Sequence, residues 1–214
     1  MAWTEGQIAA ALAGGPTAPR SDFDLIGPEA RAAALARMDP APRRAAVLCG
    51  LVPRPGGLSV VLTRRAAHLR RHAGQVAFPG GSVDPDDASD AAAALREANE
   101  EVGLAPAQVR LAGALAPYVT RTGFHVSPFV GFVDPDWTPR PDPSEVDLVF
   151  EAPLDFLMDP RNCLTRVFER AGERRRYYAF TWEGHLIWGA TAGMLMGLAD
   201  RRGGVAPGAR AAGE

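Results

Sequence analysis

The sequence predicts an α/β or α+β fold, in which a mixed β-sheet is sandwiched between helices. Runs of apolar and β-branched residues recur along the chain and predict strands. Segments with a helical pattern are isolated from one another and lie between or beside these runs. Of the 214 residues, 47% are hydrophobic and 22% are charged, which is enough apolar material for a hydrophobic core. We therefore expect one main domain with additions at its ends.

The strand pattern begins with two runs that predict a hairpin. Arg44–Val52 and Leu58–Arg64 are separated by a proline- and glycine-rich stretch over residues 53–57, which favours a broad turn. The remaining predicted strands are Val109–Tyr118, Phe124–Val133, Val146–Phe150, Leu164–Glu169 and Tyr177–Trp182.

Helical periodicity predicts the other elements. We expect helices at Ile8–Leu12, Pro28–Met38, Asp87–Val102 and Leu186–Ala199, and a short turn at Pro153–Leu157. These elements divide the chain into a helical N-terminal extension (1–43), the main domain (44–200) and a Gly-, Ala- and Arg-containing tail (201–214) that we expect to be mobile. The extension is a candidate lid or a candidate contact in a homodimer.

Charge and hydropathy exclude several classes of partner. The net charge of −2 gives no overall attraction to nucleic acid or to an anionic membrane surface. The apolar stretch Leu186–Ala199 is shorter than the ~18 residues that a membrane-spanning helix needs. An acidic residue, Glu5, stands where a secretory signal would carry basic ones, so we expect a cytoplasmic protein.

The ionisable side chains narrow the chemistry further. All 23 basic residues are arginine, which excludes a phosphate-binding loop lysine and Schiff-base catalysis. Any bound phosphate must therefore be held by arginine, backbone or metal. Cys49 and Cys163 lie far apart in apolar, strand-like segments, and we expect two buried thiols rather than a disulfide or a metal pair.

The helix expected at Asp87–Val102 carries clear end signals and one apolar face. Asp87 is the expected N-cap, and Gly103 is placed to end the helix in the left-handed conformation. The residues expected to pack on the sheet share one arc of the helix and are Ala91, Ala94, Leu95, Ala98 and Val102.

A second arc of this helix carries three acids that folding alone does not favour. Glu97 faces like charges at Glu100 and Glu101, and each such pair is unfavourable by ~0.2–0.5 kcal/mol. The acids also lie near the helix C-terminus, where the dipole disfavours a negative charge by ~0.3–1 kcal/mol. A solvated acidic face is one interpretation. In a partly enclosed site, two carboxylates ~4 Å apart repel by ~4 kcal/mol, and a cation is then required.

The residue types around these acids indicate which cation. Ligands that are all oxygens select hard ions, so we interpret the cluster as a site for Mg²⁺ or Mn²⁺. A carbonyl in the preceding Phe78-Pro79-Gly80-Gly81 turn is a candidate further ligand. Arg96 is expected either to orient one of the carboxylates or to form a surface ion pair.

Basic residues are concentrated between residues 64 and 72, just before the acidic helix. They are either a solvated loop or contacts for phosphate, which the guanidinium fork binds in a bidentate manner. His68 and His72 have helical spacing, but no glutamate follows His68 as in zinc hydrolases, so we do not expect zinc. Gly74-Gln75 forms either a turn or a contact to substrate.

These residues together resemble the Nudix box. The match consists of Gly81, an acid at Asp87, and the segment Arg96-Glu97-Ala98-x-Glu100-Glu101-x-Gly103-Leu104. It departs from the pattern in having aspartate at position 87 and one extra residue before Arg96. The preceding segment, Leu62-Thr63-Arg64-Arg65-Ala66 with Arg70, Gly74 and Phe78-Pro79-Gly80-Gly81, is similar to a motif of coenzyme A diphosphatases, and the resemblance covers roughly residues 44–199.

The resemblance implies a Nudix-like fold and hydrolysis of a diphosphate bond with Mg²⁺ or Mn²⁺ as cofactor. For the subfamily it implies cleavage of coenzyme A or acyl-CoA to 3′,5′-ADP and 4′-phosphopantetheine or its acylated form. The implied metal ligands are Glu97, Glu100, Glu101 and Gly81. The implied catalytic residues are Arg96 and either Glu100 or Glu145 as the base. The implied substrate contacts are Arg64, Arg65, Arg70, Gly74, Gln75, Phe78 and Gly80.

Two other functions are compatible with these motifs. One is a Nudix hydrolase that acts on ADP-ribose, NADH or nucleoside triphosphates. The other is a non-catalytic nucleotide-binding module, which the three intact glutamates disfavour because a dead site has no reason to retain their repulsion.

Overall fold

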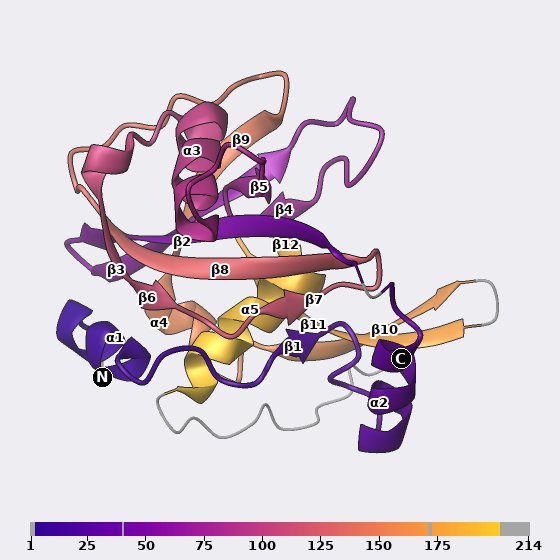
Figure 1. Cartoon of the computed structure of the whole chain (residues 1–214). Helices are drawn as coiled ribbons and strands as arrows, with labels where there is room; N and C mark the ends of the chain where they lie inside the picture. Colours follow the sequence, from indigo (N-terminus) through magenta and orange to yellow (C-terminus); the bar gives the residue numbers. More distant parts are fainter. Residues whose placement is uncertain (1–2, 40, 171–172, 202–214) are drawn as a thin grey trace.

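The structure is a computed structural model, and it describes residues 3–39, 41–170 and 173–201. Two β-sheets and the helices packed on them form the fold (Figure 1). The helices are α1 (Glu5–Leu12), α2 (Pro28–Ala36), α3 (Asp90–Val102), α4 (Leu154–Leu157) and α5 (Gly189–Asp200), with a 3₁₀ turn, η1, at Pro106–Gln108.

Within the described residues, nine strands form a mixed sheet and three form a smaller antiparallel one. The strands of the large sheet are β1 (Arg20–Ser21), β2 (Arg43–Arg54), β3 (Gly57–Arg65), β4 (Val76–Ala77), β5 (Gly80–Ser82), β6 (Val109–Ala114), β7 (Tyr118–Val119), β8 (Phe124–Val133) and β9 (Val146–Pro153). The strands of the small sheet are β10 (Leu164–Arg170), β11 (Glu173–Trp182) and β12 (His185–Trp188).

The long strand β2 organises the large sheet. It runs parallel to β8 from Arg43 to Leu51, and it forms the expected antiparallel hairpin with β3. The short strand β5 pairs antiparallel with the start of β2, so that Gly81 lies opposite Ala46. Strand β9 pairs with the other edge of β3. The mixed sheet predicted from the sequence is thereby confirmed.

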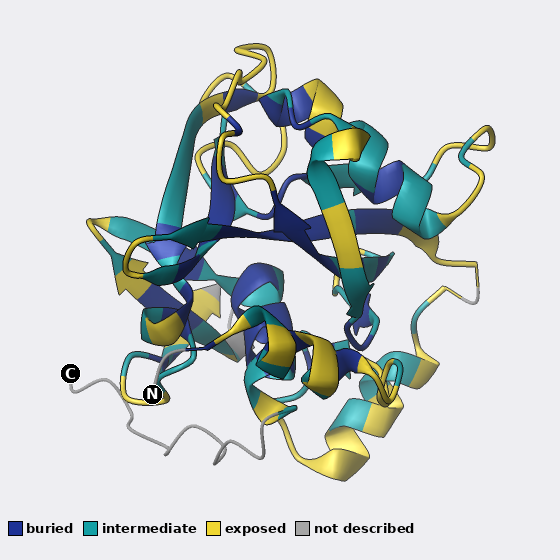
Figure 2. Ribbon diagram, turned by 90° about the vertical axis from the view of Figure 1, so that its left-hand side faces the viewer, coloured by how far each residue is buried: buried dark blue, intermediate teal, exposed yellow. Residues whose placement is uncertain are grey.

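Side chains of β2 alternate between two hydrophobic cores because successive residues of a strand point to opposite faces. Ala46 and Leu48 pack with Ala94 and Ala98 of α3 on one face of the sheet. Cys49 and Leu51 point to the other face, where α1, α5 and the small sheet cover them. Figure 2 shows the resulting dark-blue strands between the two layers. Both cysteines are free and buried, as predicted.

Several predicted boundaries are corrected by the structure. The strand expected over Val109–Tyr118 is two strands, β6 and β7, because the chain leaves the sheet between Ala114 and Tyr118. The helix expected from Leu186 begins only at Gly189, since residues 185–188 pair with β11 as β12. The predicted tail lies largely in 202–214, outside the described residues. None of the described helices is long and apolar enough to cross a membrane.

The start of α3 also differs from the prediction. Ser89, not Asp87, is the N-cap, and its hydroxyl accepts a hydrogen bond from the backbone N–H of Ala92 at 3.1 Å. Asp87 lies before the helix and is available for another contact. The C-terminal signal is confirmed, since Gly103 has φ +68° and ends the helix in the left-handed conformation.

The segment before β2 is attached to the large sheet by a buried tyrosine. β1 pairs parallel with β7, and the hydroxyl of Tyr118 donates a hydrogen bond to Asp22 at 2.9 Å. Gly193 of α5 packs directly on the Tyr118 ring. A Cβ at position 193 would lie 2.7 Å from Tyr118 Oη and 2.9 Å from Cζ, so only glycine fits there.

We predict that Gly193→Ala lowers the free energy of unfolding by about 1–3 kcal/mol, because the added methyl group overlaps a ring that is itself buried. Urea denaturation followed by circular dichroism measures the change. Gly197→Ala is the matched control on the same helix, because its Cβ would meet only the flexible Arg20 side chain at 3.3 Å. Equal stabilities for the two variants would contradict the proposed packing.

Candidate active site

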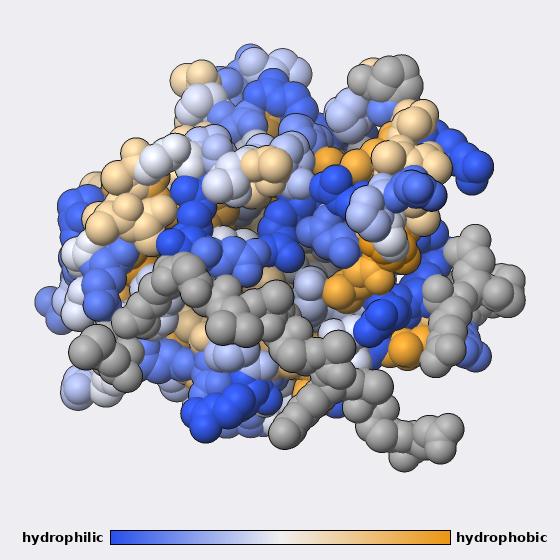
Figure 3. All heavy atoms as spheres, turned by 90° about the horizontal axis from the view of Figure 1, so that it is seen from below, coloured by the Kyte–Doolittle hydropathy of each residue, from blue (hydrophilic) through white to orange (hydrophobic). Residues whose placement is uncertain are grey.

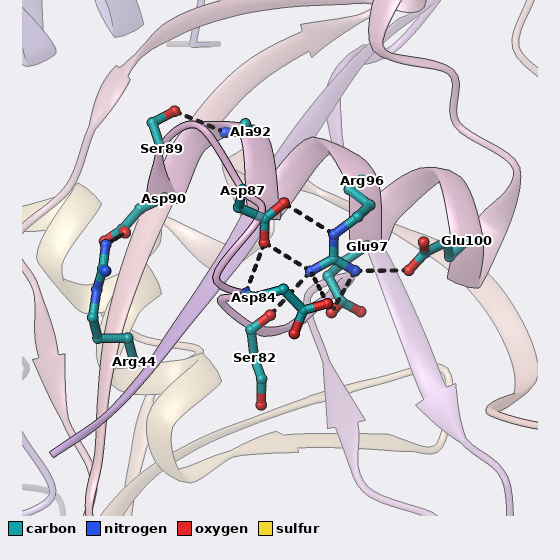
Figure 4. A network of polar contacts seen from close by, with 10 residues as sticks. All are labelled: Arg44, Ser82, Asp84, Asp87, Ser89, Asp90, Ala92, Arg96, Glu97 and Glu100. Carbon is teal, nitrogen blue, oxygen red and sulfur yellow. Dashed lines mark hydrogen bonds and ion pairs between the residues drawn. The ribbon is translucent and has the colours of Figure 1, made fainter.

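Acids of α3 and of the loop before it surround a single arginine, Arg96, on the outer face of the helix. The guanidinium of Arg96 binds Asp87 through two hydrogen bonds of 3.0 Å and also donates to the Ser82 carbonyl at 3.1 Å (Figure 4). Its third nitrogen donates to Glu97 at 3.1 Å and to Glu100 at 2.8 Å. Of the loop acids, Asp87 is therefore the bidentate partner of Arg96, and the guanidinium offsets the repulsion among the acids of the cluster.

The three glutamates do not lie in one environment. The side chain of Glu100 is 57% exposed and contacts Arg96, whereas that of Glu101 is only 3% exposed. Glu97 lies between these extremes, with 15% of its side chain exposed. The single acidic arc predicted from helical spacing is thus divided into an outward and an inward part.

Glu101 is held beneath the turn that precedes the helix. One of its oxygens accepts a hydrogen bond from the backbone N–H of Gly80 at 3.0 Å, and the other accepts one from Arg65 at 3.3 Å. Burial raises the pKa of Glu101 to about 7, although both hydrogen-bond partners act in the opposite direction. A buried carboxylate with a raised pKa is an arrangement that a bound cation would stabilise as the charged form.

Glu97 lies against the backbone of β5. A Cβ on Gly81 would be 2.6 Å from the Glu97 carboxylate, so position 81 requires glycine for this approach. Burial also raises the pKa of Glu97, and the negative charges of Glu100 and Glu145 add to this effect. Glycine at position 81 therefore allows the β5 backbone to approach this carboxylate closely.

Glu145 approaches the same acids from a distant part of the chain. It precedes β9, and its charge raises the pKa of both Glu97 and Glu101. Its carbonyl accepts a hydrogen bond from Ala66 N–H at 2.8 Å, which fixes the turn over 142–145 to the end of β3. The charge of Glu145 therefore acts on both Glu97 and Glu101.

The donor set fits a hard divalent cation. The side-chain groups, Glu97, Glu101 and Glu145, are all carboxylates, and the β5 backbone at Gly81 lies against Glu97. Across the described ranges, no three His, Cys, Asp or Glu side chains converge as in a formed metal centre. The carboxylates are instead held by Arg96 and Arg65, so a cation would take over part of the charge compensation that these arginines now supply.

A cavity of about 440 Å³ opens beside Arg65. It lies between the large sheet, the small sheet and the start of α5, and Arg65 is both a lining residue and the partner of buried Glu101. A volume of this size is typical of small-molecule sites. Arg65 therefore links the acids to the cavity, although Glu97, Glu101 and Glu145 are not among its lining residues.

The sequence-predicted substrate residues are divided by the structure. Arg65, Gln75 and Phe78 line the cavity, as does His72, whose ring nitrogen lies 2.8 Å from the Gln75 side chain. Gly80 contacts Glu101 instead. The lining does not include Arg64, Arg70 or Gly74, and Arg70 and Gly74 are exposed on the loop after β3.

Many lining residues were not found by sequence reasoning. They come from the segment before β2, from the β7–β8 turn and from β10–α5, and include Asp22, Thr120, Arg121, Tyr177 and Trp188. No local motif marks them, because they are brought together only by the pairing of β1 with β7 and by the packing of the small sheet below the large one.

Comparisons with known proteins identify relatives of this chain. The NUDIX domain profile matches residues 42–171. An Escherichia coli (strain K12) protein named uncharacterized Nudix hydrolase NudL is 42% identical over 181 residues, which is 84% of this chain and 90% of that protein. The crystal structure of a NUDIX hydrolase from Alicyclobacillus acidocaldarius is 22% identical, with 57% of this chain and 82% of that chain covered and a TM-score of 0.49. A Nudix hydrolase from M. smegmatis, RenU, is 24% identical, with 55% and 74% covered and a TM-score of 0.47.

We predict a pH dependence of stability that originates at Glu101. Its pKa of about 7 in the folded protein lies above the ordinary value of 4.5, so the folded state holds this proton more tightly than the unfolded state. The contribution of Glu101 to the free energy of unfolding therefore falls by about 2 kcal/mol as the pH rises from about 5 to 8. Urea denaturation in the presence of a chelator measures it.

Glu101→Gln removes this titration while keeping an oxygen for Gly80. The variant should therefore lose less stability than the wild type between pH 5 and pH 8. Glu29→Gln, on the exposed face of α2, is the control and should follow the wild type. Parallel curves for wild type and Glu101→Gln would show that the folded protein does not hold a raised Glu101 pKa.

Proposed function

The chain belongs to the Nudix family of hydrolases, and we propose that it hydrolyses the diphosphate bond of coenzyme A or acyl-CoA with Mg²⁺ or Mn²⁺ as cofactor. The products would be 3′,5′-ADP and 4′-phosphopantetheine or its acylated form. The observation that carries the hydrolytic part is the pair of shielded carboxylates, Glu97 and Glu101, which interact with the charge of exposed Glu145. Arg65, the partner of Glu101, also lines the cavity. The coenzyme A part rests on the motif from Leu62 to Gly81, two of whose quoted residues, Arg65 and Phe78, line that cavity.

In this proposal, Glu97 and Glu101 hold the cation, with the Gly81 carbonyl and Glu100 as further ligands. A bound divalent ion neutralises charge on the diphosphate and makes a bound water more acidic. Arg96 acts as a positioning residue, because its double hydrogen bond to Asp87 fixes the side from which it contacts Glu97 and Glu100.

Glu145 is the base that the geometry favours. The attacking water loses a proton as its oxygen bonds to phosphorus, and the bridging oxygen leaves with the other phosphate. Glu145 lies near the inward-facing acids, whereas the Glu100 carboxylate is taken up by Arg96 at 2.8 Å. We therefore propose that Glu145 accepts this proton, and that Arg65 and Gln75 contact the substrate next to it.

We predict that the purified protein with Mg²⁺ or Mn²⁺ converts coenzyme A to 3′,5′-ADP, measured by liquid chromatography and mass spectrometry. A parallel panel contains ADP-ribose, NADH and nucleoside triphosphates. Coenzyme A left intact while one of these is cleaved would assign the enzyme to that substrate. Intact substrates throughout would leave a nucleotide-binding module as the better description.

We predict that Glu97→Gln and Glu101→Gln each lower the turnover number by about a hundredfold or more, because each removes a charged ligand from the proposed cation site. Both variants should remain folded, since the substitution also relieves repulsion within the cluster. Initial rates at saturating metal and substrate measure the effect, with Glu29→Gln as the control for loss of a glutamate charge. Undiminished turnover in either variant would remove that residue from the site.

A further inference from the structure

One face of the small sheet presents an aromatic surface to the cavity. In the β10–β11 register Phe168 lies opposite Arg175 and Arg166 opposite Tyr177, while Trp188 of β12 lies opposite Ala179. Residues directly opposite each other on paired strands share a face, and so do alternate residues along one strand. Phe168, Tyr177 and Trp188 are therefore on the same side of the sheet. All three line the cavity.

Two rings on this face pack against each other, and the third, that of Phe168, is exposed to solvent. The rings of Tyr177 and Trp188 meet edge to face with their centroids 5.2 Å apart. Phe168 is 43% exposed, which is unusual for a side chain of its size and apolarity. Figure 3 shows that the most apolar side chains on this side of the molecule gather mostly in the half that contains the β10–β11 hairpin.

The charges around the same cavity are mainly positive. Its lining includes Arg65, Arg121, Arg175 and Arg176, against the two acids Asp22 and Asp24. Both acids already have partners within the segment they hold in place. Asp22 accepts hydrogen bonds from Tyr118 and the Arg121 backbone, and Asp24 accepts them from Ser21, Arg20 and Arg31.

We infer that this cavity holds the nucleotide half of the substrate, with the base stacked on the aromatic face formed by Phe168, Tyr177 and Trp188. This inference rests on the proposed function and adds to it the orientation of the substrate. A nucleotide combines a flat aromatic ring with adjacent negative charge, which matches rings flanked by guanidinium groups. The pantetheine arm has no ring and is uncharged apart from its phosphate, so it lacks both features.

The orientation follows from the position of Arg65. This residue lines the cavity and contacts Glu101, so the diphosphate would sit at Arg65, between the cavity and the acids. The base then points toward the small sheet, and the pantetheine arm extends away from it. Phe168, Tyr177 and Trp188 are accordingly specificity-determining residues rather than catalytic ones.

Strand β10 offers a matched pair of variants for the test. Phe168 and Val167 are both 43% exposed and adjacent, but they lie on opposite faces, and only Phe168 lines the cavity. Binding of adenosine 3′,5′-bisphosphate and of 4′-phosphopantetheine is measured by isothermal titration calorimetry. We expect Phe168→Leu to raise the Kd for the bisphosphate by roughly tenfold and to leave phosphopantetheine unchanged.

Two controls separate stacking from general apolar packing and from misfolding. Phe168→Tyr keeps the ring and should bind the bisphosphate as the wild type does, and Val167→Ala should change neither ligand. Circular dichroism checks that each variant is folded. Full nucleotide affinity in Phe168→Leu, or a loss confined to phosphopantetheine, would overturn the inference.

Because these are binding measurements without turnover, the two proposals fail separately. A protein that binds the bisphosphate on this face but cleaves no coenzyme A would refute the proposed function alone. A protein that cleaves coenzyme A with unchanged affinity in Phe168→Leu would refute the stacking alone.

Discussion

The burial of one carboxylate determines how the rest of the site is built. Glu101 is almost fully removed from solvent, and an ionised group in that position is stable only if each oxygen has a partner. One partner is a backbone N–H of β5 and the other is a guanidinium from β3. The pairing of β5 with β2 and the packing of α3 on the same sheet are therefore conditions for the site as well as for the fold.

Arginine compensates charge on both sides of α3. On the outer side, Arg96 joins Asp87, Glu97 and Glu100 in one network, and on the inner side Arg65 contacts Glu101. A chain without lysine uses the planar guanidinium for both tasks, and the bidentate bond to Asp87 is a geometry that an ammonium group cannot form. The helix can thus carry acids near its C-terminus in spite of the helix dipole.

Local patterns predicted the parts of this protein that depend on local physics. The predicted strand Phe124–Val133 matches β8, and Gly103 ends α3 as its position indicated. The helix cap was misplaced because Asp87 and Ser89 are both good caps, and only the Arg96 contact, which depends on the fold, decides between them. β1, β4 and β5 are too short for any periodicity to reveal them. The acids of α3 were visible in the sequence, but the difference in burial between Glu100 and Glu101 is set by β5.

The origin of the cavity walls bears on how related proteins can differ in the substrate they accept. Half of its lining residues lie outside the stretch matched by the domain profile, at the two ends of the chain, whereas the acids and Arg65 lie inside it. Changes in the terminal segments can therefore reshape the walls around a ligand without disturbing the helix that carries the acids. Two chains with the same central stretch and different ends would share a reaction and differ in what they accept, so comparison of the central stretch alone assigns the chemistry better than the substrate.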